Sequence, residues 1–168
     1  LGTDQNGRDY LSRLIYGTRV SITIGLGAAT VGLLIGVTMG VLAGYFGGWV
    51  DAVLMRVTDI FLAFPFLVAL LVVRNFLGEL SFLEPIVGVR TSIRFIILLF
   101  VIFGWMGVAR LVRGSVLALK EREFVEASRA LGASNTRVIF KHLLPNSIGP
   151  ILVAATNAVV AAIIATTW

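Results

Sequence analysis

Cysteine is absent from this 168-residue chain, and charged residues make up only 14% of it. Without cysteine, the chain can form neither a disulfide framework nor a thiolate metal site. Soluble domains carry roughly 25% charged residues and about half apolar ones. Here 58% of the residues are hydrophobic and the mean hydropathy is +0.97. A chain of this composition would aggregate in water, so we predict that its solvent is lipid.

Two other shortages exclude kinds of chemistry. His142 is the only histidine, and it has neither a cysteine nor a carboxylate pair beside it, so it cannot form a zinc site. Glycine is nowhere followed by lysine, which excludes the phosphate-binding loop of many ATPases. We therefore predict no metal site, no cofactor and no ATP hydrolysis by this chain.

Four apolar blocks are present, and the first, residues 20–46, contains no charge. A hydrocarbon core about 30 Å thick requires roughly 20 helical residues, which this block supplies. Only helices satisfy their own backbone in lipid at such lengths, so we predict an all-α bundle of transmembrane helices. The other three predicted spans are residues 57–73, 95–109 and 148–167. Residues 1–19 form an external segment, and residues 20–168 form the membrane domain.

The positions of the basic residues predict the orientation of the bundle. Seven lysines and arginines lie in the connection 110–141, and such residues collect in cytoplasmic loops. The connection 46–56 is then cytoplasmic too, and the connection 75–94 is external. The net charge of +5 is not accompanied by an aromatic–basic stripe or a helix-turn-helix pattern, so we predict no nucleic-acid partner.

The long cytoplasmic connection is itself predicted to be helical. Apolar residues recur at three- and four-residue steps between residues 115 and 142. Gly132 interrupts this pattern, and Ser134 and Asn135 suit the cap of a new helix. We predict a helix, a turn at residues 132–135, and a second short helix that stops at Pro145.

One run within this connection resembles the EAA loop of binding-protein-dependent importers. Glu126-Ala127-Ser128 is followed by three residues and Gly132, and after nine more residues by His142-Leu143-Leu144-Pro145. Ser128 replaces the second alanine of the motif. His142 stands where the general motif has isoleucine, which is familiar in the peptide-importing branch.

Residues 1–9, 55–65 and 107–113 also look like segments of dipeptide and oligopeptide permeases, so the resemblance covers nearly the whole chain. It implies a multi-pass permease subunit of an ATP-driven importer in the bacterial cytoplasmic membrane. The implied partners are a second permease subunit, cytoplasmic ATP-binding subunits, an extracytoplasmic solute-binding protein and membrane lipid. Permeases of this branch usually have six spans, so the first and last are expected to be missing here.

The resemblance assigns coupling to the ATPase to the loop at residues 111–145. Small residues there permit close approach of a partner surface, and charged ones can make contacts at its rim. The alternative is an ordinary amphipathic connector at the membrane interface. The predicted coupling residues are Glu123, Glu126, Ala127, Arg129, Ala130, Gly132, Ala133 and Pro145.

Three features of the spans carry further predictions. Gly32, Gly36, Gly40 and Gly44 recur every fourth residue, a spacing that lets another helix approach closely, although glycine is common in membrane helices generally. Arg56 and Asp59 lie three residues apart near the cytoplasmic edge, where we expect a structural ion pair or side chains that extend to the interface in preference to a functional role. Pro65 should kink its helix.

Two other functional classes are weighed against an ATP-driven permease. A secondary transporter or channel would need ionisable residues at mid-span, and the first and fourth blocks have none. A membrane-anchored interaction protein without a transport role is the third possibility. The substrate stays open among dipeptides, longer peptides, glutathione and nickel chelates.

Overall fold

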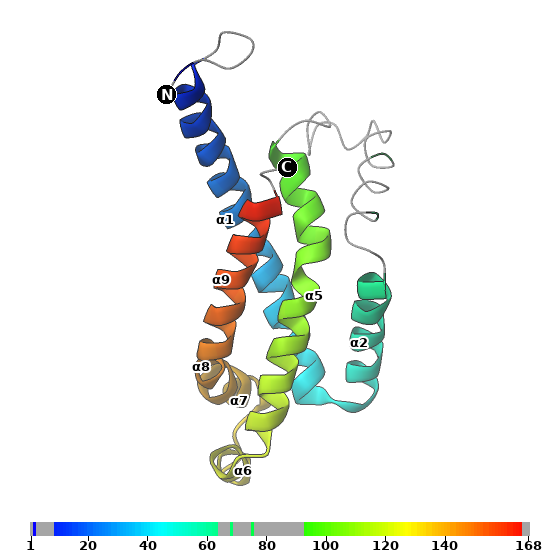
Figure 1. The fold of residues 1–168 in the computed structure, drawn as a ribbon. Coiled ribbons are helices and arrows are strands. Elements are labelled where there is room, and N and C mark those ends of the chain that lie inside the picture. Colours follow the sequence, from blue (N-terminus) through cyan, green and yellow to red (C-terminus); the bar gives the residue numbers. More distant parts are fainter. Residues whose placement is uncertain (1, 3–8, 64–67, 69–74, 76–92, 166–168) are drawn as a thin grey trace.

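The computed structural model describes residues 2, 9–63, 68, 75 and 93–165, and the elements in these ranges are helices (Figure 1). Helices α1 (Tyr10–Phe46) and α5 (Ile93–Lys120) lie side by side, and α9 (Ile148–Ala165) packs against both. The predicted all-α fold is confirmed.

Two of the described helices can each cross a membrane by length and composition, namely Tyr10–Phe46 and the stretch Phe100–Lys120. A third candidate span combines Asn135–Asn146 with Ile148–Ile164, which are bent by 63° at their junction. The predicted span at residues 57–73 lies partly in α2 (Gly48–Ala63). Its remainder, including the predicted kink at Pro65, lies mostly outside the described residues.

Helix α1 begins ten residues earlier than the apolar block from which it was predicted. Asp9 caps its N-terminus, where the carboxylate accepts hydrogen bonds from the backbone N–H groups of Leu11 and Ser12 at 3.3 and 3.2 Å. Residues 10–19 include enough polar side chains that hydropathy alone does not predict a helix there. The Asp9 cap nevertheless satisfies the first free N–H donors of α1. The external segment predicted at residues 1–19 therefore includes the first turns of α1.

The glycines predicted to allow close packing are all buried, and they face α5. A Cβ atom placed on Gly36 would lie 2.6 Å from the carbonyl oxygen of Trp105, and one on Gly44 would lie 2.9 Å from Cβ of Val116. Gly32 is less crowded, since its nearest neighbouring atom would be at 3.7 Å. The backbones of α1 and α5 therefore approach closely along the last turns of α1.

Helix α2 follows α1 through Gly47 and Gly48, whose φ angles of +64° and +50° turn the chain back along the bundle. Two ion pairs join α2 to α5. Arg113 donates to both carboxylate oxygens of Asp51 at 2.5 and 2.6 Å, and Arg110 donates to Asp59 at 2.5 Å. The hydrogen bonds from Arg113 lower the pKa of Asp51.

The predicted pair of Arg56 with Asp59 is therefore wrong. Helical spacing brings the two residues near one another, but α2 is turned so that the Asp59 carboxylate reaches Arg110 on α5 instead. Which arginine pairs with Asp59 depends on how α2 packs against α5, and spacing within one helix does not predict that packing.

Candidate functional site

Residues 121–147, called here the connecting segment, lie between α5 and α9 at one end of the bundle (Figure 1). They form α6 (Glu123–Ala130), α7 (Asn135–Val138), the π-helical turn η2 (Ile139–Leu143) and α8 (Leu144–Asn146). The turn from α1 to α2 lies at the same end (Figure 1). The predicted order of helix, turn and second helix is confirmed.

Gly132 makes the turn between α6 and α7. Its φ of +79° lies in the left-handed region that favours glycine. The N–H of Gly132 donates to the carbonyl of Arg129 at 2.9 Å, and that of Ala133 donates to the carbonyl of Ser128 at 3.1 Å. These two bonds are the Schellman arrangement, which satisfies carbonyl groups at the end of α6. Ser134 then caps α7 by accepting from the N–H of Arg137 at 3.4 Å.

Two details of the predicted segment are wrong. The helical pattern from residue 115 is broken after Lys120, because Arg122 has an extended backbone and α6 starts anew at Glu123. The second helix also does not stop at Pro145, which stands in the first turn of α8. The helical backbone continues from η2 into α8, so Pro145 lies within one helical stretch that ends at Asn146, one residue beyond the predicted stop.

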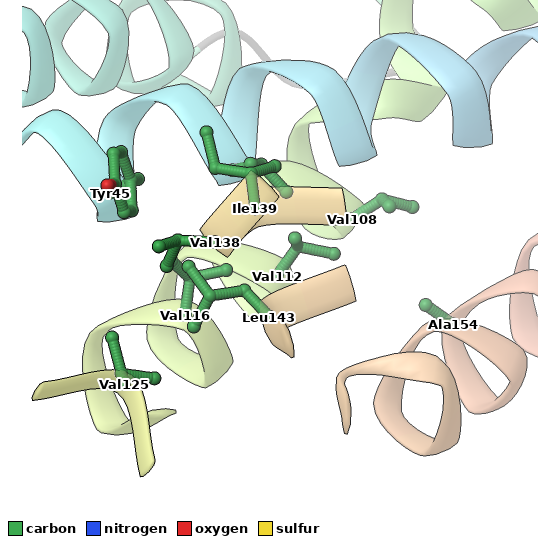
Figure 2. Packing of buried hydrophobic residues seen from close by; sticks show 10 residues of the cluster. Tyr45, Val108, Val112, Val116, Val125, Val138, Ile139, Leu143 and Ala154 are labelled. Atoms are coloured by element: carbon green, nitrogen blue, oxygen red, sulfur yellow. The ribbon is translucent and has the colours of Figure 1, made fainter. Parts of the chain in front are cut away.

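The connecting segment is held to the bundle by an apolar core. Val125 of α6, Val138 of α7 and Leu143 of η2 are fully buried. Figure 2 shows them beside Val112 and Val116 of α5, with Tyr45 of α1 at the edge of the same cluster. Because these three side chains are buried against α5, the connecting segment is packed firmly onto the bundle.

Four predicted coupling residues share one exposed face of α6, since they stand three, four and seven positions apart. The two glutamates among them lie in the first turn, where negative charge is favourable beside the helix N-terminus. Leu131 follows at the end of α6 and is 89% exposed. The face thus combines carboxylates, small side chains and one large apolar side chain. Its four predicted members are Glu123, Glu126, Ala127 and Ala130.

The other predicted residues do not join this face. Arg129 turns toward the bundle, with its guanidinium carbon 5.2 Å from the centre of the Tyr45 ring. Ala133 is half-buried and packs against the apolar core. Gly132 forms the turn, and Pro145 is exposed on α8.

Several contacts of the connecting segment were not found from the sequence. The Tyr45 hydroxyl donates to Oδ1 of Asn135 at 2.8 Å, across 90 positions of the chain. Ser128 Oγ and His142 Nε2 are 3.3 Å apart, and the His142 ring lies 6.2 Å from that of Phe124. No local pattern marks such pairs, because their partners come from separate elements.

Metal chemistry has no support in the described part of the chain, where no group of three or more histidines, cysteines or carboxylates could hold an ion. What the site does offer is a surface at the end of a helical bundle, built on a rigid core. Such a surface can bind another protein.

Comparison with known proteins identifies a family. The model of the "binding-protein-dependent transport system inner membrane component" matches residues 32–168. The dipeptide transport system permease protein DppC of Bacillus subtilis is 41% identical over 98% of this chain and 48% of its own length. The oligopeptide permease protein OppC of the same organism is 43% identical over 96% of this chain and 49% of its own length.

A glutathione transport system permease protein, GsiD of Pectobacterium atrosepticum, is 38% identical over 91% of this chain and 47% of its own length. The chain thus spans about half the length of the curated relatives it matches. Among solved structures, the MetNI methionine ABC transporter in inward-facing conformations has a chain with a TM-score of 0.75 and 24% identity. The match covers 89% of this chain and 69% of that one, and it supports the fold.

Proposed function

The chain belongs to the family of binding-protein-dependent transport system inner membrane components, and from this membership we propose that it is part of a permease subunit of an ATP-driven importer. The observation that carries the proposal is identity of about 40% with three peptide permeases over more than nine-tenths of the chain. Their names specify dipeptide, oligopeptide and glutathione transport, so the proposed substrate is a short peptide.

The proposed division of labour follows from what the chain offers. Its sequence has no phosphate-binding loop, so ATP would be hydrolysed on separate cytoplasmic subunits. A second permease subunit would complete the path through the membrane, and an extracytoplasmic solute-binding protein would deliver the peptide.

The exposed face of α6 is the proposed ATPase contact. Ala127 and Ala130 have small side chains, so a partner backbone can approach this face closely. Glu123 and Glu126 offer charged contacts on the same face. Burial of Val125 on the opposite side supports the proposal, because a push on α6 would be received by the bundle core. The glycines of α1 have a packing role and would not contact the ATPase.

The test is to purify the importer from membranes through a tag on this chain. We expect ATPase subunits to co-purify in a fixed ratio, and proteoliposomes containing the complex to accumulate a labelled dipeptide only with ATP and the binding protein. A charge-reversing pair, Glu123→Lys with Glu126→Lys, should reduce co-purification, whereas Glu121→Lys outside the α6 face serves as the control. Peptide uptake driven by an ion gradient, with no ATPase bound, would contradict the proposal.

A further inference from the structure

Tyr45 is the last residue but one of α1 and lies where the connecting segment meets the bundle. It is 8% exposed and belongs to the core cluster that includes Val125 and Val138. Its hydroxyl donates to Asn135, the first residue of α7, and its ring lies beneath Arg129 of α6. One side chain therefore contacts both arms of the turn at Gly132.

The two contacts of Tyr45 differ in kind from the rest of the interface. Val125, Val138 and Leu143 hold the segment by apolar burial, which has no directional preference. A hydrogen bond and a cation–π contact depend on distance and angle, so they fix the orientation of α6 and α7 relative to α1.

The α1 side of this connection is firm. Just before Tyr45 in α1, Gly40 and Gly44 are in tight contact with α5. Cβ atoms added to them would lie 2.6 and 2.9 Å from their nearest neighbouring atoms. Lys120 Nζ also donates to the carbonyl of Gly44 at 3.2 Å, which ties the end of α1 to the end of α5. The end of α1 cannot rotate without moving α5.

From this geometry we propose that Tyr45 is the positioning residue that fixes the orientation of α6 and α7 relative to α1. Through it, movement of α6 and α7 reaches the paired helices α1 and α5. The inference rests on the proposed function, since it names a directional contact that acts beside the apolar core when a movement at the ATPase contact reaches the membrane helices. Its partners Arg129 and Asn135 both lie outside the exposed face of α6.

The contacts can be separated by substitution. Tyr45→Phe removes the hydroxyl bond and leaves the ring beneath Arg129, while Tyr45→Leu removes both contacts and keeps an apolar side chain in the cluster. Asn135→Ala removes the side-chain oxygen that accepts the hydrogen bond from the Tyr45 hydroxyl. Tyr16→Phe is the matched control, because Tyr16 lies on the same helix, is 70% exposed and is remote from the connecting segment.

The first measurement is peptide taken up per ATP hydrolysed, with both rates determined in the same proteoliposomes. Tyr45→Phe should lower this ratio about fivefold, which is the change that one typical net hydrogen bond produces. Tyr45→Leu should lower it about tenfold or more, since two directional contacts are lost. Tyr45→Phe combined with Asn135→Ala should cost no more than Tyr45→Phe alone. A purely structural role would instead reduce assembled complex and both rates in proportion.

The second measurement needs no ATPase. Spin labels on cysteines at Trp49 and Leu131, both highly exposed, report the distance between the start of α2 and the end of α6. Tyr45→Leu should broaden that distance distribution, and Tyr16→Phe should not. An unchanged distribution, or an unchanged uptake-to-hydrolysis ratio in Tyr45→Leu, overturns the inference. A wild-type complex without ATP-driven uptake would contradict the proposed function, while the distance measurement would still decide the role of Tyr45.

Discussion

A Cβ atom added to Gly40 would lie 2.6 Å from the carbonyl oxygen of Ala109, closer than real side chains approach a backbone atom. Gly32 lies two turns earlier on the same helix, and its added Cβ would be 3.7 Å from the nearest atom of Gly104, which is ordinary contact. The two glycines thus belong to one sequence pattern but meet different surroundings.

Gly40→Ala should therefore separate α1 from α5 and destabilise the bundle by about 1–3 kcal/mol, the usual cost of overpacking. Gly32→Ala should be neutral or stabilising, because alanine gains up to about 1 kcal/mol of helix propensity over glycine. Thermal unfolding of the detergent-solubilised protein, followed by circular dichroism, compares the two. Equal effects of both substitutions would mean that the close contact at Gly40 does not limit packing.

Gly132 offers a second comparison of substitutions. Gly132→Ala should strain the left-handed turn by about 1–2 kcal/mol, whereas Gly132→Asn should cost much less, because asparagine tolerates this conformation. A Cβ there would meet no atom within 4 Å, so the strain comes from the backbone alone. Unfolding midpoints of the three proteins measure this order.

Gly132→Leu adds bulk on the exposed side of the same turn. We expect it to abolish ATP-driven uptake and ATPase co-purification while the protein remains in the membrane. A loss of 2–3 kcal/mol of docking free energy would shift binding by roughly 30- to 150-fold. Uptake in Gly132→Ala shows how much of this loss the backbone strain explains. Normal uptake by Gly132→Leu, with the partner bound, would remove Gly132 from the proposed contact.

The ion pair of Asp51 with Arg113 predicts a pH dependence. The pKa of Asp51 is lowered in the folded protein, so the pair stabilises the fold above the unfolded pKa near 4 and this contribution is lost as pH falls through the lower folded pKa. Asp51→Asn should cost about 1–2 kcal/mol at pH 7, since the carboxylate is 19% exposed and accepts two bonds.

The difference between wild type and Asp51→Asn should persist at pH 5 and shrink only below about pH 4. Asp59→Asn is the control, because that pair is about half exposed and should contribute less than about 1 kcal/mol. Unfolding midpoints measured across this pH range test both statements. A larger effect of Asp59→Asn would reverse the ranking of the two ion pairs.

The orientation of the bundle can be tested because the chain has no cysteine. Single cysteines at Ser12 and Ser134 lie near opposite ends of the bundle (Figure 1). An impermeant thiol reagent applied to intact cells should label the cysteine at residue 12, and that at residue 134 only after the membrane is permeabilised. Labelling of residue 134 in intact cells would show that the predicted orientation is inverted.

Local patterns predicted much of the connecting segment. Apolar residues at helical spacing indicated the helices, and Gly132 with Ser134 marked the turn between them correctly. The glycine spacing on α1 indicated a close helix contact, but Gly32 and Gly40 look identical in that pattern. Their difference depends on atoms of α5, which follow some seventy positions later in the chain.

The sequence by itself determined the solvent, the helical class and the turn at Gly132, because hydropathy and backbone preference act over a few neighbouring residues. Tertiary structure alone decided the pairing of Asp59 with Arg110 and the place of Tyr45 between Arg129 and Asn135. Each of these depends on where separate helices lie in space. That arrangement is set by packing over the whole bundle, so no short stretch of sequence contains it.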